Sequence, residues 1–182
     1  MNHWYLVASL PSLTLGAEPP LSNSAFRALC GEHLPPADLP ELDAVLQGGG
    51  RSEFAREWRR LDAVIAAECA AVRAARHGVD PAPYRDTAAV PDLALAAQIR
   101  DALQQPDPRA RELRLDALRS RLLAELAQPQ PFGLPAVLAY ALRLQLAARQ
   151  AARTEAAGRQ RLAGHLDAVL AEFDRLAAET SA

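Results

Sequence analysis

Residues 132–180 read FGLPAVLAYALRLQLAARQAARTEAAGRQRLAGHLDAVLAEFDRLAAET, and this long, nearly glycine-free stretch decides the fold. Its first half carries apolar residues at the three- and four-residue steps of a helix. A proline stands in the first turn, where its missing amide hydrogen would have no partner in any case. The proline is Pro135, and the apolar residues are Leu134, Val137, Leu138, Ala141, Leu142 and Leu146. The stretch therefore predicts a helical scaffold that carries no chemistry of its own.

The second half of this stretch carries a separate apolar stripe, whose steps of four and three residues are typical of a seam packed against another helix. Its members are Leu162, Leu166, Val169, Phe173 and Leu176. A polar segment, residues 149–161, lies between the two stripes. One unbroken helix of this length would reach roughly 70 Å, more than a compact domain needs. The sequence favours two helices joined near residues 156–158, and leaves open one helix that protrudes.

The composition of the 182 residues favours helices over a sheet. Hydrophobic residues make up 50% of the chain and aromatic residues only 5%, while Ala and Leu dominate and β-branched residues are sparse. All 20 residues of the Lys+Arg count are arginine, which excludes Schiff-base chemistry on lysine. The formal net charge of -2 argues against a nucleic-acid partner.

Cap and turn residues divide the rest of the chain into further helices, for a total of about six or seven. The expected first residues are Ser22 or Ser24, Leu39, Ser52, Pro91 and Asp107 with Pro108. A triple glycine, residues 48–50, ends one helix and lacks the Lys and Ser/Thr of a phosphate-binding loop. Residues 4–10 read as a short irregular or β-leaning segment stopped by Pro11. We expect one all-α domain over residues 1–182, an elongated or bilobal bundle with a boundary near residues 78–91.

No arrangement of reactive side chains predicts catalysis. The four histidines lack the spacing of metal ligands. They are His3, His33, His77 and His165. Cys30 and Cys69 lie on the expected apolar faces of helices, and we expect them to be small core residues. We expect Trp58 to be a large side chain that anchors the core. Glu53 and Glu57 lie one helical turn apart and are surrounded by arginines. We therefore expect them to lie on a charged helix face that is exposed to solvent. We therefore expect no catalytic residue, no metal, no cofactor and no small-molecule substrate.

Arginines gather in two groups. The first consists of Arg109, Arg111, Arg114, Arg119 and Arg121, and the second of Arg143, Arg149, Arg153, Arg159 and Arg161. Three nearby carboxylates, Glu112, Asp116 and Glu125, offset the charge of the first group, whereas only Glu155 offsets that of the second. The second group is therefore the better candidate for a partner surface, with ordinary solvation of a helix as the alternative. The candidate partner-binding residues are Arg143, Arg149, Arg153 and Arg159.

The sequence predicts neither membrane insertion nor export. No apolar stretch approaches the roughly 18 residues of a membrane span. The first residues lack Lys and Arg, and Pro11 interrupts the apolar run, which argues against a signal peptide. Two distant cysteines make the cytosol the simplest compartment.

The opening residues carry the most specific pattern in the chain. They read WYLVASLP over residues 4–11, followed by PPLS at residues 19–22 and by Phe26 and Cys30. This block resembles the start of an uncharacterised bacterial family encoded beside V-type (vacuolar/archaeal-type) ATPase subunits. Further matches lie at Trp58 and over residues 73–84 and 139–146. That family is in turn similar to the C (also called d) subunit of V/A-type ATPases, a helical socket between the central stalk and the membrane rotor ring.

The resemblance implies a non-catalytic accessory subunit that couples the soluble head and central stalk to the rotor ring in proton or sodium transport. Such a subunit is cytoplasmic and lies at the inner membrane only through its complex, with other V-type ATPase subunits as partners. The C subunit is about twice this length and three-lobed, so this chain matches only part of it. An assembly or regulatory adaptor that binds one ATPase subunit transiently is the alternative. A free-standing helical enzyme would need a deep pocket with perturbed carboxylates or histidines.

Overall fold

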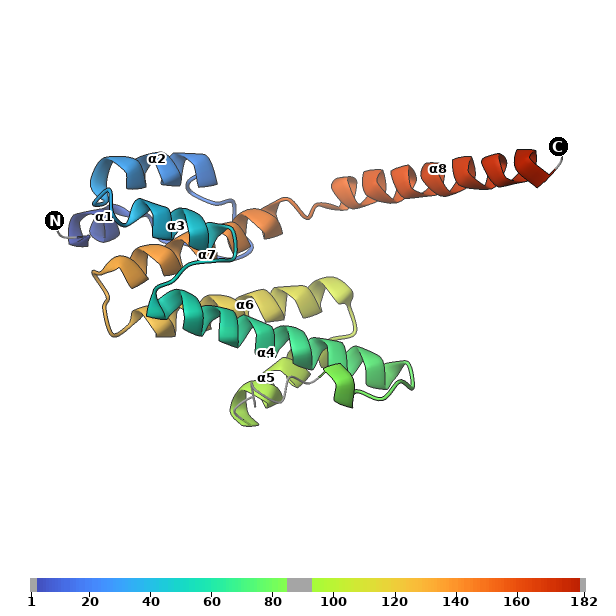
Figure 1. Ribbon diagram of the computed structural model, residues 1–182, viewed down its shortest axis with the longest axis horizontal. Helices are drawn as coiled ribbons and strands as arrows, with labels where there is room; N and C mark the ends of the chain where they lie inside the picture. The colour runs from blue at the N-terminus through green and yellow to red at the C-terminus, as the bar shows by residue number, and fades with distance from the viewer. Residues whose placement is uncertain (1–2, 85–92, 181–182) are drawn as a thin grey trace.

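The computed structural model describes residues 3–84 and 93–180. Within these residues the chain forms eight α-helices and one short 3-10 helix, with no strand, which confirms the all-α fold class (Figure 1). The elements are α1 (Trp4–Ser9), α2 (Asn23–His33), α3 (Leu39–Leu46), α4 (Glu53–Arg76), η1 (Ala82–Tyr84), α5 (Leu93–Gln104), α6 (Pro108–Ala127), α7 (Leu134–Ala151) and α8 (Glu155–Thr180). The count exceeds the six or seven predicted helices because the N-terminal segment is also helical.

The prediction of an irregular or β-leaning N-terminal segment is wrong, since Trp4–Ser9 forms α1. The backbone N–H of Val7 donates to the carbonyl of His3 at 3.0 Å. Leu6 is 1% exposed in the core, so burial of one helical face outweighs the weak local helix propensity. Leu10 is extended because Pro11 follows it, and α1 ends there.

Side-chain caps fix the starts of three predicted helices. The Ser22 hydroxyl accepts a hydrogen bond from the amide of Ala25 at the start of α2. Ser52 caps α4 in the same way, and the Asp107 carboxylate accepts two amide hydrogen bonds at the start of α6. The expected start at Pro91 lies outside the described residues, and so does part of the expected boundary at residues 78–91.

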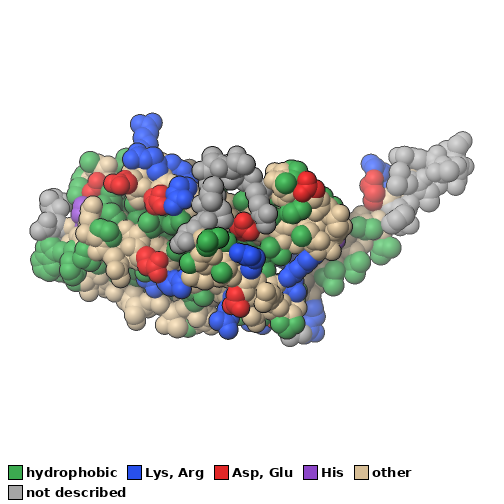
Figure 2. All heavy atoms as spheres, turned by 90° about the horizontal axis from the view of Figure 1, so that it is seen from below, with side chains coloured by type: hydrophobic (Ala, Val, Ile, Leu, Met, Phe, Trp, Pro, Cys, Tyr) green, Lys and Arg blue, Asp and Glu red, His purple; other side chains and the backbone are tan. Residues whose placement is uncertain are grey.

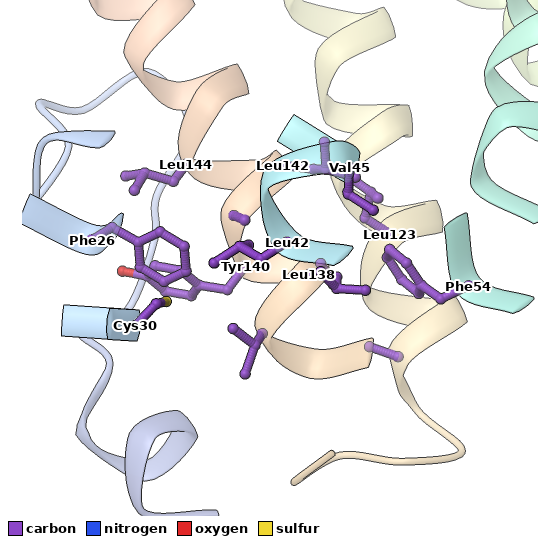
Figure 3. Close-up of a cluster of buried hydrophobic side chains, with 14 of the residues drawn as sticks. Phe26, Cys30, Leu42, Val45, Phe54, Leu123, Leu138, Tyr140, Leu142 and Leu144 are labelled. Carbon is purple, nitrogen blue, oxygen red and sulfur yellow. The ribbon is translucent and has the colours of Figure 1, made fainter. Parts of the chain in front are cut away.

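Helix α7 is the centre of the first of two buried clusters, as its apolar stripe predicted. Val137, Leu138 and Leu144 have no exposed surface. Side chains from α2, α3, α4 and α6 surround α7 (Figure 3). The rings of Phe26 and Tyr140 lie 5.3 Å apart, and the Tyr140 hydroxyl donates to the carbonyl of Pro11, which ties the N-terminal segment to α7.

The second cluster lies between α4, α5 and α6. Its most buried residues, each 3% exposed or less, are Val64, Ile65, Ile99, Ala102 and Leu115. Because α4 and α6 also contribute to the first cluster, these two helices join the two parts of the core.

The structure places three predicted core residues in or beside these clusters. Cys30 is fully buried in the first and Cys69 is buried in the second. Trp58 is only half-buried at the edge of the first cluster, where Phe54 holds the buried position instead. The core anchor on this helix is therefore Phe54, one turn before the predicted residue.

The C-terminal stretch forms two helices, as favoured from the sequence, but the joint lies at residues 152–154 and not at residues 156–158. Gly158 continues α8, and its amide donates to the carbonyl of Thr154 at 3.0 Å. A glycine inside a helix costs only about 1 kcal/mol, so it need not break one. Figure 1 shows α8 leaving the bundle and extending to the C-terminus.

Candidate functional site

Two aromatic side chains are exposed at the end of the bundle that holds the N-terminus. Trp4 is 52% exposed and Tyr5 57%, although their neighbour Leu6 is buried. The ring of Tyr5 lies edge-on to that of Trp4 at 6.0 Å and to that of His33 at 5.4 Å. We call Trp4, Tyr5 and His33 the aromatic end. Figure 2 shows hydrophobic side chains gathered at this end of the molecule.

Two contacts attach the aromatic end to the bundle. Leu6 anchors α1 in the core, and His3 Nε2 lies 2.7 Å from Asp38 Oδ2, immediately before α3. Large aromatic side chains on a fixed helix bury much apolar area at little entropic cost, and Trp and Tyr are enriched among residues that dominate protein interfaces. This arrangement suits contact with another protein.

Two of the four predicted partner-binding arginines, Arg149 and Arg153, lie beside a buried carboxylate on α6. The side chain of Asp116 has no exposed surface, and its two oxygens bind Arg149 and the amide of Gln150 from α7. Arg119 approaches it at 3.6 Å from α6, and Arg153 at 3.8 Å from the joint before α8. We call these five residues the Asp116 cluster. It fastens the end of α7 to α6.

Three of the four candidate arginines contact residues of α6. Arg149 binds Asp116, Arg153 lies 3.4 Å from Glu112, and Arg143 donates to the hydroxyl of Ser120 at 3.0 Å. The fourth candidate, Arg159, is exposed on α8. Partner binding by these side chains stays a prediction, but the geometry gives the first three a role in holding α6 against α7.

Sequence reasoning missed Asp116, which it treated as one of several carboxylates that offset the arginines of α6. The signal was present in the spacing. Asp116 shares one face of α6 with three other buried residues, Ser120, Leu123 and Ala127. Small side chains at helical spacing allow a close approach to the neighbouring helix, and a carboxylate on such a face needs a buried partner.

A hollow of about 690 Å³ lies beside the Asp116 cluster, between the start of α6 and the first turns of α8. Among the described residues that line it are Arg109, Glu112, Arg153 and Arg161. Of the described residues that line the hollow, only Glu112 is acidic, and it forms an ion pair with Arg153. The hollow's described lining residues include charged side chains but no cysteine and no histidine.

The two cysteines lie in environments that suppress thiol reactivity. Burial raises the pKa of the Cys30 thiol to about 11, and burial also raises the pKa of the Cys69 thiol. Both thiols are therefore protonated at neutral pH, and the thiolate is the nucleophilic form. In the described ranges, no three histidine, cysteine or acidic side chains lie close enough to hold a metal ion.

Comparison of the chain with protein-family models, with curated proteins and with solved structures finds no match. Across residues 3–84 and 93–180, none of the helices combines the length and apolar character that crossing a bilayer requires.

Proposed function

We propose that this chain is a non-catalytic accessory subunit of a bacterial V-type ATPase and that it docks on the complex through the aromatic end. The observation that carries the proposal is the exposure of Trp4 and Tyr5 on a helix anchored in the core. The same two residues open the sequence block that resembles the family encoded beside V-type ATPase subunits. A single short segment therefore carries both the resemblance and an exposed contact surface.

The geometry suits a rigid adaptor. Two buried clusters share α4 and α6, so a load applied at one end of the bundle passes through continuous helices to the other. The resemblance implies coupling of the soluble head and central stalk to the membrane rotor ring, in proton or sodium transport, with the chain peripheral to the inner membrane through its complex. Since Arg143, Arg149 and Arg153 bind within the chain, the aromatic end is the preferred docking surface.

The test is recovery of the tagged chain from solubilised membranes of its own host, with its partners quantified by mass spectrometry. We expect about one copy per ATPase complex for the unchanged chain. The double variant Trp4→Ala, Tyr5→Ala should lose most of this recovery, because truncating one aromatic hot spot costs ~2 kcal/mol of binding, or about 30-fold in affinity. Tyr84→Ala is the matched control, since Tyr84 is 47% exposed on η1, away from the aromatic end.

Three results would change the proposal. Trace recovery with one free ATPase subunit would favour the alternative, a transient assembly or regulatory adaptor. Recovery without any ATPase subunit would refute both. Equal binding by the double variant and Tyr84→Ala would leave the ATPase partner standing and remove the aromatic end as the docking surface. Circular dichroism of each variant shows that the comparison is between folded proteins.

A further inference from the structure

Helix α8 exposes an apolar stripe that the bundle does not cover. Leu162 is 60% exposed, Leu166 55% and Val169 52%, at the seam spacing of four and three residues. Leu170, 62% exposed, widens the stripe on one side. Every described side chain of α8 is exposed, and the ribbon lies apart from the bundle along most of its length (Figure 1). An amphipathic helix in water gains most of its stability by burying such a stripe against a partner.

The apolar residues of α8 are spaced so that two copies of the helix, packed antiparallel, would bring these residues into contact. In an antiparallel pair of α8 helices centred between residues 167 and 168, Leu166 of one copy faces Val169 of the other, and the symmetry repeats the contact. Leu162 then faces position 173, which the sequence fills with Phe. The small side chain of Ala163 lies opposite Leu170, which gives the widened part of the stripe room to pack.

The charges along α8 select the antiparallel orientation. Residues 155–165 hold two arginines, a histidine and one glutamate, whereas residues 166–180 hold four carboxylates and one arginine. In a parallel pair the basic halves of the two helices would lie together, and so would the acidic halves. The antiparallel pair sets the basic half of each helix beside the acidic half of the other, and brings His165 next to Glu172.

We propose that α8 pairs with α8 of a second copy of this chain in an antiparallel two-helix coiled coil. The pairing goes beyond the accessory function proposed above and does not depend on it, since α8 and the aromatic end lie at opposite ends of the molecule (Figure 1). In this dimer the two paired α8 helices form a central rod. One helical bundle lies at each end of the rod, and each bundle has its own aromatic end.

Light scattering after size-exclusion chromatography of the full chain tests the pairing. We expect the molecular mass of the unchanged chain to rise toward that of two copies as its concentration increases. Leu166→Arg puts a charge in the central layer, and the mass falls to that of one copy at every concentration. Ala171→Arg adds the same charge on the opposite face of α8 and leaves the two-copy mass in place.

Disulfide trapping tests the orientation. Chains with Leu166→Cys and chains with Val169→Cys, mixed under mild oxidation, become cross-linked, while the unchanged chain controls for Cys30 and Cys69. Leu162→Cys alone does not cross-link, because antiparallel helices separate the two copies of that residue by roughly 16 Å along the axis, beyond the reach of a disulfide.

A one-copy mass for the unchanged chain at all concentrations would overturn the proposal and leave α8 for a different partner. A two-copy mass that Leu166→Arg does not alter would also overturn it, because the contact would then lie elsewhere. Efficient cross-linking of Leu162→Cys alone would replace the antiparallel pair with a parallel one. Loss of ATPase recovery has no bearing on any of these measurements.

Discussion

Arg149, in the last turn of α7, binds the carboxylate of Asp116, which is fully buried on α6. The sequence placed this arginine on a candidate partner surface, where reversing its charge would not affect folding. The contact changes that expectation, because losing Arg149 removes the nearest cation from a buried carboxylate, which keeps only Gln150 and the more distant Arg119 and Arg153.

Arg149→Glu should destabilise the fold, since it sets a carboxylate against Asp116. Arg149 is itself 46% exposed, so solvent reduces the effect to about 1–3 kcal/mol. Arg161→Glu, at an exposed position on α8, should leave the unfolding free energy nearly unchanged. Urea denaturation of the two variants measures the difference. Equal stability of both variants would mean that the Asp116 cluster does not hold α6 against α7, and would restore Arg149 as a partner-binding candidate.

Gly50 should tolerate no side chain, whereas Gly48 should tolerate one at modest cost. Both have a positive φ, of 99° and 82°. A Cβ on Gly50 would also lie 2.7 Å from side-chain atoms of Ala55 and Val45, while a Cβ on Gly48 would meet nothing within 4 Å. We expect Gly48→Ala to cost ~1 kcal/mol from backbone strain alone and Gly50→Ala clearly more. Thermal unfolding of the two variants gives the order, and the reverse order would contradict the packing at this turn.

Glu41 should make the fold sensitive to acid. Burial alone would raise its pKa, but hydrogen bonds from Ser52 and Arg51 outweigh burial and lower it overall. A carboxyl with a lowered folded-state pKa contributes stability above its unfolded pKa of about 4.3, and that stability is lost as the pH falls through the folded-state value. The melting temperature of Glu41→Gln should therefore lie below that of the unchanged chain at pH 7 and approach it below about pH 4. A gap that stays constant with pH would show that charge on Glu41 does not matter.

The two cysteines should resist alkylation in the folded chain and react at once in denaturant. Cys30 has no exposed surface and Cys69 is 8% exposed, and burial raises the pKa of both thiols. A thiol reagent at neutral pH, followed by intact mass measurement, counts the labelled cysteines with and without guanidinium. Rapid labelling of the folded chain at either position would place that thiol outside the core.

Local signals in the sequence predicted the parts of the fold that depend on local chemistry. Ser22, Ser52 and Asp107 cap helices because their side chains bond to amides of the following turn, a contact that spans few residues. The apolar stripe of α7 likewise predicted the central helix of the first cluster. The all-α class followed from these signals together with the composition.

Contacts between distant segments decided the rest. Trp4–Ser9 is helical because Leu6 packs in a core built from residues far along the chain, and that burial also leaves Trp4 and Tyr5 exposed. Asp116 is buried because α7 lies against its face of α6. The spacing of Asp116, Ser120, Leu123 and Ala127 marks one face of α6, but which helix covers that face depends on contacts between distant segments. The aromatic end and the partners of Asp116 therefore emerged only with the structure.

The three-residue joint before α8 makes that helix a lever. Arg153, in this joint, forms ion pairs with Glu112 and Asp116 on α6. These ion pairs help to hold α8 at its angle to the bundle. At 1.5 Å per residue α8 is about 39 Å long, and a turn of about 10° at the pivot displaces the far end by on the order of 7 Å. A small rotation at the joint that holds Arg153 would therefore move the far end of α8 by several ångströms.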